Sequence, residues 1–171
     1  MKIITLIPLL ILIFACSSTV EKEKEILKKI IEPNIFIEVS KIDPSVIKFG
    51  KSYDVEALPN AKAVSRAIFN KKDIEIREYG SHSDAVNYGQ DYAINSAGKD
   101  AIVSGEGILW KEGAKDRRKC VPRAGNSEAG CNQKPRFGGY IILGNLIILC
   151  EGITEQESLT TCHQLKDSII P

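Results

Sequence analysis

Hydrophobic residues form one long run at the start of the chain and shorter, periodic patterns after it. Residues 3–14 are almost wholly apolar, follow a single lysine and lead into Ala15, Cys16 and two serines. About a dozen apolar residues are too few to cross ~30 Å of hydrocarbon as a helix that rises 1.5 Å per residue. The pattern therefore predicts a signal peptide over residues 1–15 rather than a membrane-spanning helix.

The next segment, residues 16–33, is polar and is expected to act as a tether. Glutamate and lysine alternate at its centre, and Ile26, Leu27, Ile30 and Ile31 then share one helical face. This spacing predicts a short amphipathic helix that docks on the following domain and ends at Pro33.

Residues 34–171 alternate between strand and helix periods. We expect strands over 35–39, 46–49, 74–79 and 101–110, and helices over 61–70 and 84–97, the first capped by Asn60. The apolar stretch 139–150 predicts either one kinked strand or a hairpin that turns at Gly144 and Asn145. Thr154 and Glu157 have the spacing of a capping box that opens a last helix. The sum is a single small α+β domain, with a mostly antiparallel or mixed sheet and two to three helices packed on one face.

The end of the first apolar run carries a more specific signal. Ile13-Phe14-Ala15-Cys16 resembles a bacterial lipobox, and the bulky Phe14 is similar to the relaxed lipoboxes of spirochaete, especially leptospiral, outer-membrane lipoproteins. The resemblance implies cleavage before Cys16 and acylation, including palmitate, of its thiol and new amino group. Acyl chains of this kind anchor a protein stably. The implied location is the outer membrane, with the exposed face, surface or periplasmic, left open.

Composition narrows the functions that the domain can have. The 171 residues suit one core, and 23 basic against 22 acidic residues provide no overall attraction to nucleic acid, which we do not expect as a partner. The chain has two histidines, and we find no catalytic motif, no metal-ligand spacing and no cofactor-binding loop. We therefore expect a non-enzymatic protein without a metal or cofactor.

The cysteines predict two disulfides. Apart from Cys16, the chain has Cys120, Cys131, Cys150 and Cys162, an even number in a chain expected to be exported. Three pairings are possible, and we favour Cys120 with Cys131 and Cys150 with Cys162. The first would close a loop and contribute about 2–3 kcal/mol.

That loop, residues 111–138, is the candidate binding site. Its residues 111–136 include eight basic and three acidic residues, a net charge of +5 in a nearly neutral chain. Such a local field can collect an anionic polysaccharide or an acidic protein, although a charge run is also typical of a solvated surface loop. The candidate contact residues are Lys115, Arg117, Arg118, Lys119, Arg123, Lys134 and Arg136.

A second resemblance concerns the domain itself. Residues 84–103, a helix followed by Gly98-Lys99-Asp100-Ala101-Ile102-Val103, look like the passage from helix to core strand in the RcsF and YbjQ-like group of small envelope proteins. The resemblance implies a small α+β fold and, for the stress-sensing lipoprotein of that group, two disulfides and protein partners.

Together these patterns lead to two hypotheses. The first is a lipid-anchored surface lipoprotein, an adhesin-like protein that binds an anionic glycan or a host protein through the basic loop. The alternative is a periplasm-facing structural or stress-sensing lipoprotein that contacts peptidoglycan or other envelope proteins.

Overall fold

The computed structural model describes residues 27–121 and 130–170. Its elements in chain order are β1 (Ile30–Ile31), η1 (Val39–Lys41), β2 (Lys48–Tyr53), β3 (Ala61–Phe69), β4 (Lys72–Tyr79), α1 (His82–Asp84), η2 (Ala85–Gly89), α2 (Gln90–Ser96), β5 (Arg118–Val121), β6 (Gly130–Pro135), β7 (Phe137–Leu143), β8 (Leu146–Glu151) and α3 (Glu155–Ile169). The signal peptide, Cys16 and Arg123 lie outside the described residues.

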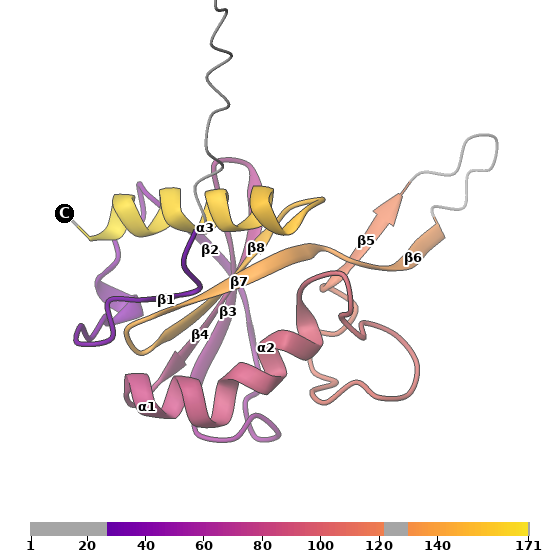
Figure 1. Ribbon diagram of the computed structural model, residues 1–171, viewed down its shortest axis with the longest axis horizontal. Coiled ribbons are helices and arrows are strands. Elements are labelled where there is room, and N and C mark those ends of the chain that lie inside the picture. The colour runs from indigo at the N-terminus through magenta and orange to yellow at the C-terminus, as the bar shows by residue number, and fades with distance from the viewer. Residues whose placement is uncertain (1–26, 122–129, 171) are drawn as a thin grey trace, which may run out of the picture.

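Six strands form one mixed sheet in the order β1-β7-β8-β4-β3-β2. All neighbours in it are antiparallel except β1 and β7, which are parallel. Strands β5 and β6 pair separately as a two-stranded ribbon that extends away from the sheet (Figure 1). The predicted α+β class with a mixed sheet is confirmed.

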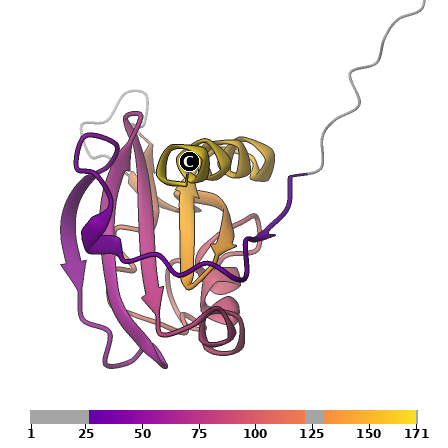
Figure 2. The same ribbon diagram turned by 90° about the vertical axis from the view of Figure 1, so that its left-hand side faces the viewer.

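Helices cover both faces of the sheet (Figures 1 and 2). On one face α3 packs on alternate residues of β7 and β8, among them Ile141 and Ile148. On the other face, the continuous helical segment α1-η2-α2 packs on the intervening residues, among them Ile142 and Ile147. The prediction of helices on one face is therefore wrong, and β7 and β8 lie buried between the helices.

Several predicted elements are present. Residues 137–151 form the β7–β8 hairpin, and its two-residue turn is Gly144 and Asn145. The Oγ1 atom of Thr154 accepts a hydrogen bond from the Glu157 amide and so caps α3. The strand over 74–79 and the helix over 84–96 are also present, as β4 and as α1-η2-α2.

Other predicted elements are absent. The segment 61–69 is strand β3 rather than a helix, and residues 101–110 form an irregular loop rather than a strand. In that loop Gly105 and Gly107 have φ of +77° and +90°, values that a regular strand does not allow. The predicted strand over 35–39 is absent, because residues 32–38 are irregular and Val39 begins η1. The expected tether helix is replaced at Ile30–Ile31 by the short strand β1.

One predicted disulfide is present. Cys150 at the end of β8 is bonded to Cys162 on α3, with 5.7 Å between their Cα atoms. Cys120 and Cys131 are Cα partners in the β5–β6 ladder, and residues directly opposite each other in such a ladder lie about 4.5–5.5 Å apart. Their side chains lie outside the described part of the structure, so the second disulfide stays a prediction.

No helix in the described ranges is long and apolar enough to cross a membrane.

Candidate functional site

The predicted loop is a ribbon with a fixed base. We call the described residues 111–121 and 130–136 the basic ribbon; they comprise a turn-rich segment, β5 and β6 (Figure 1). Two of its arginines point into the protein, whereas several lysines remain at the surface. The six candidate contact residues that the structure describes therefore divide into two groups with different roles.

Arg117 belongs to the interior of the protein. Its side chain is 2% exposed, its Nε donates to Glu75 Oε2 at 2.8 Å, and its Nη1 donates to the Trp110 carbonyl at 3.2 Å. Its Cζ also lies 4.1 Å from the centroid of the Trp110 ring. Burial lowers the pKa of Arg117, and the charge of Glu75 opposes that effect. Arg117 is therefore not accessible to a surface ligand, in contrast to the prediction.

Glu75 holds a second buried arginine. Its other oxygen accepts from Arg77 Nε at 2.8 Å, and Arg77 Nη2 donates to Ser96 Oγ at 2.9 Å. Glu75 and Arg77 are also almost fully buried. We call Glu75, Arg77 and Arg117 the buried ion cluster; it connects β4, α2 and the basic ribbon.

Arg136 fixes the other strand of the ribbon. Its guanidinium pairs with the carboxylate of Asp73 and donates to the carbonyls of Asp116, at 2.8 Å, and Arg118, at 3.2 Å. Arg66 on β3 binds the same Asp73 at 2.6 Å. Because Arg136 binds two backbone carbonyls of the ribbon as well as the carboxylate of Asp73, it attaches the base of the ribbon to β4.

Asp116 adds a third attachment. Its carboxylate accepts from Tyr53 Oη at 2.9 Å and pairs with Lys51 at 3.4 Å. Burial alone would raise the pKa of Asp116, but these hydrogen bonds hold it below its usual value. Burial, followed by the bond to Asp116, raises the pKa of Tyr53 well above its usual value. Both groups therefore keep their bonded protonation states at neutral pH.

The remaining described cations of the ribbon are exposed to different degrees. Lys111, Lys115 and Lys134 are exposed and have no carboxylate within 4.0 Å in the described part of the chain. Lys119 is partly exposed, and its Nζ lies 3.9 Å from Glu151. Arg118 is partly buried. The structure therefore keeps a cluster of basic side chains at the surface after two arginines are used internally.

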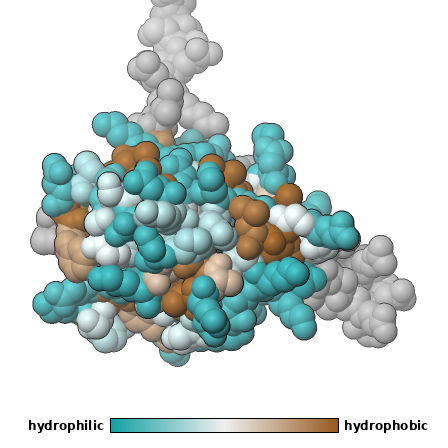
Figure 3. All heavy atoms as spheres, turned by 90° about the horizontal axis from the view of Figure 1, so that it is seen from below, coloured by the Kyte–Doolittle hydropathy of each residue, from teal (hydrophilic) through white to brown (hydrophobic). Residues whose placement is uncertain are grey.

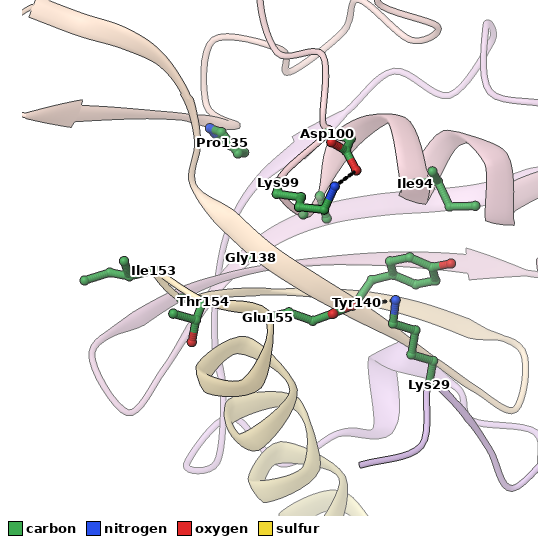
Figure 4. A pocket seen from close by; sticks show the side chains of 13 residues that line it. Lys29, Ile94, Lys99, Asp100, Pro135, Gly138, Tyr140, Ile153, Thr154 and Glu155 are labelled. Carbon is green, nitrogen blue, oxygen red and sulfur yellow. Dashed lines mark hydrogen bonds and ion pairs between the residues drawn. The ribbon is translucent and has the colours of Figure 1, made fainter. Parts of the chain in front are cut away.

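A groove of about 460 Å³ adjoins the ribbon at Pro135, and sequence reasoning missed it. Its floor is the start of β7, and its sides are the end of α2 and the start of α3 (Figure 4). Ile94 and Ile153 stand on its two sides and are 50% and 82% exposed. The pair Gly138-Gly139 was the one sequence signal, since a Cβ at Gly138 would collide with the backbone of Gly152 and Thr154.

Apolar side chains also reach the surface on the side covered by α1 and α2, where they form patches among hydrophilic residues (Figure 3). Exposed members on α2, the preceding η2 and the following loop are Tyr88, Ile94, Ile102 and Leu109.

The two histidines are engaged with backbone. His82 Nδ1 lies 2.9 Å from the Gly144 carbonyl oxygen, and His163 Nε2 lies 2.9 Å from that of Lys28. Within residues 27–121 and 130–170 there is no group of three or more His, Cys, Asp or Glu side chains that could hold a metal ion.

Comparison with known proteins identifies a family but no characterised relative. No curated protein and no solved structure matches the chain. A family model described as a family of unknown function (DUF6810) matches residues 38–171, which include all of the sheet except β1. Since this match covers more than half of the chain, the protein belongs to the DUF6810 family.

Proposed function

We propose that the protein is a lipid-anchored, non-enzymatic lipoprotein of the cell surface that binds a polyanionic partner through its basic ribbon. The observation that carries this proposal is that some cations of the ribbon bind the protein itself, whereas others remain at its surface. Arg117 and Arg136 attach its base to Glu75 and Asp73, whereas Lys111, Lys115 and Lys134 are exposed and Lys119 is partly exposed. A binding surface that is ordered in advance loses less entropy when a ligand binds.

This arrangement revises the set of contact residues. Lys115, Lys119 and Lys134, with Arg118 beside them, are the contacts that the exposure of the ribbon favours. Arg117 and Arg136 become positioning residues, because their guanidinium groups bind the protein itself. An anionic polysaccharide such as a sulphated glycan suits several separate lysines, since each ammonium acts as a point charge.

The anchor rests on the lipobox-like sequence at Cys16. Cys16 is eleven residues before Leu27, the first residue that the structure describes. Eleven residues of extended chain span at most about 40 Å, so an anchored domain would stay within that distance of the bilayer surface. Polyanions at the cell surface lie within reach of a domain held there.

Replacing Cys16 with alanine is expected to release the protein from the membrane. The thiol that receives the acyl chain is then missing, so the variant should incorporate no labelled palmitate and should move from the membrane fraction to the soluble fraction. The neighbouring Ser17→Ala variant is the control and should keep both properties. Equal membrane association of the two variants would disprove the anchor.

Replacing Lys115, Lys119 and Lys134 together with serine is expected to weaken binding to heparin about tenfold at ~0.15 M salt. Exposed ion pairs contribute roughly 0.2–1 kcal/mol each, and three of them approach the 1.4 kcal/mol that equals one factor of ten. The difference from the unaltered protein should shrink as salt is added, because salt screens exposed charges. Heparin affinity measured by titration at three salt concentrations tests this.

The matched control carries the same charge change elsewhere. Lys48, Lys62 and Lys71 are exposed on the β2–β4 side of the sheet, and their replacement by serine should leave heparin affinity nearly unchanged. An equal loss in both triple variants would mean that only net charge matters, and no loss in the ribbon variant would remove the ribbon as a site.

A further inference from the structure

Strand β7 has an edge that is only partly paired. On one side it pairs with β8 along its whole length, whereas on the other side β1 contributes just two residues, opposite Ile142 and Leu143. The residues of β7 before Ile142 therefore have no neighbouring strand on that side within the described structure. Such an edge offers backbone donors and acceptors to an added strand.

The hydrogen bonds around this edge locate the free groups. Ile142 donates its N–H to the Lys29 carbonyl at 2.7 Å, so the polar backbone atoms of Ile142 face away from β8. Because this direction alternates along an antiparallel strand, Tyr140 faces the same way. At the start of β7, the Phe137 carbonyl accepts from the Gly98 N–H at 2.9 Å. Between these two attachments, the N–H and C=O of Tyr140 have no partner in the described part of the chain.

The free groups lie on the floor of the groove described above. Figure 4 shows Gly138 and Tyr140 on β7 between the end of α2 and the start of α3. Lys29 crosses one end, where its ammonium pairs with Glu155 at 2.5 Å and lies 5.6 Å from the centroid of the Tyr140 ring. The edge is therefore recessed between the two helical layers.

We propose that this groove binds an extended peptide segment of another protein, which adds to the sheet as a strand beside β7 and continues the line of β1. A peptide backbone supplies both the acceptor and the donor that Tyr140 requires. The exposed side chains of Ile94 and Ile153 would contact alternate side chains of the segment.

The recess decides which occupant fits. If a second copy offered its own β7 edge, the helices that flank the edge in each copy would meet first. The two β7 edges would therefore stay apart. The described end of the chain's own tether leads away from Tyr140: Leu27 packs on the core that includes α3 residues, and the Lys28 carbonyl is bound by His163 on that helix. A single extended segment from another polypeptide satisfies both restrictions. This site is separate from the lysines of the basic ribbon and from the anchor.

The test uses the full chain in detergent and a heptapeptide selected on it from a phage-displayed random library. We expect the selected peptide to bind in one register. N-methylation of the peptide residue whose amide donates to the Tyr140 carbonyl should then weaken binding about tenfold, because that hydrogen bond is lost and the methyl group holds the two backbones apart, whereas N-methylation of the neighbouring residues should have little effect. Amide exchange in residues 137–143 should slow when the peptide is bound.

Surface variants locate the site without disturbing the fold. The double variant Ile94→Glu, Ile153→Glu changes two exposed side chains of the groove and should weaken binding of the same peptide about tenfold. Phe36→Glu, Ile68→Glu changes two exposed apolar residues elsewhere and should not. The proposal is overturned if no heptapeptide is selected, if the groove variant binds as well as the control, or if both N-methylated series bind alike.

Discussion

Replacing Glu75 with leucine is expected to lower the free energy of unfolding by about 3–5 kcal/mol. Glu75 is the shared partner of Arg77 and Arg117, and all three side chains are almost fully buried. Without the carboxylate, two guanidinium groups remain in the interior with no neighbouring negative charge from the cluster. Urea unfolding followed by circular dichroism measures the change.

Two further variants show whether charge is the cause. Glu56 is exposed and has no ion pair in the described structure, so Glu56→Leu should change stability by less than about 0.5 kcal/mol. Adding Arg77→Met and Arg117→Met to Glu75→Leu should recover part of the loss, because apolar side chains can replace a buried ion cluster. A loss below 1 kcal/mol in Glu75→Leu would contradict the role of the cluster.

Removing the disulfide between Cys150 and Cys162 by double alanine substitution is expected to cost about 3 kcal/mol. The bond closes a loop with a sequence separation of 12, and the chain-entropy estimate for a loop of that length is close to this value. Both sulfur atoms also belong to the core between the sheet and α3, so their removal leaves space there. Urea unfolding under non-reducing conditions tests the prediction.

The control for this prediction is the other cysteine pair, Cys120 and Cys131. A reducing agent should lower the free energy of unfolding of the unaltered protein and of a Cys120→Ala, Cys131→Ala variant. In both, the loss should be at least the contribution of the Cys150–Cys162 disulfide. On the variant that lacks Cys150 and Cys162 it should remove only the roughly 2–3 kcal/mol of the predicted Cys120–Cys131 disulfide. If reduction does not lower the stability of the Cys120→Ala, Cys131→Ala variant, the 150–162 bond does not stabilise the domain.

The pattern of β4 shows why the fold class could be predicted while the position of the site could not. Residues 74–79 alternate apolar and charged, which is typical of a strand with one face in water. The structure buries both faces, because Trp110 and Arg117, from the chain after α2, cover the side that carries Glu75 and Arg77 together with Ser96 on α2. Arg117 completes that buried charge from a segment 42 residues away in sequence, and spacing along the chain does not reveal such a partner.

The helix predicted over residues 61–70 is wrong for a different reason. Its apolar residues fit a helical face about as well as an alternating strand, and alanine favours the helix. The turn that follows was the better signal. Asn70 and Lys71 have φ of +48° and +64° and join β3 to β4 as a two-residue hairpin, which Asn at its first position favours.

The β7–β8 hairpin was predictable because both of its signals are local. A continuous apolar run on either side of Gly144-Asn145 predicts two buried strands and a tight turn. The edge groove beside it depends instead on where β1 begins and where α2 ends, which no local pattern specifies.

Asn145 connects distant parts of the chain. Its side chain accepts from the Ile37 N–H at 2.7 Å and donates to the Ile37 carbonyl, across 108 residues of sequence. β1 likewise pairs with β7, which is made near the end of the chain. At a synthesis rate of ~5–20 residues per second, Asn145 is added roughly 5–20 s after Ile37. The order of strands thus delays closure of the sheet during synthesis until residue 145 has been made.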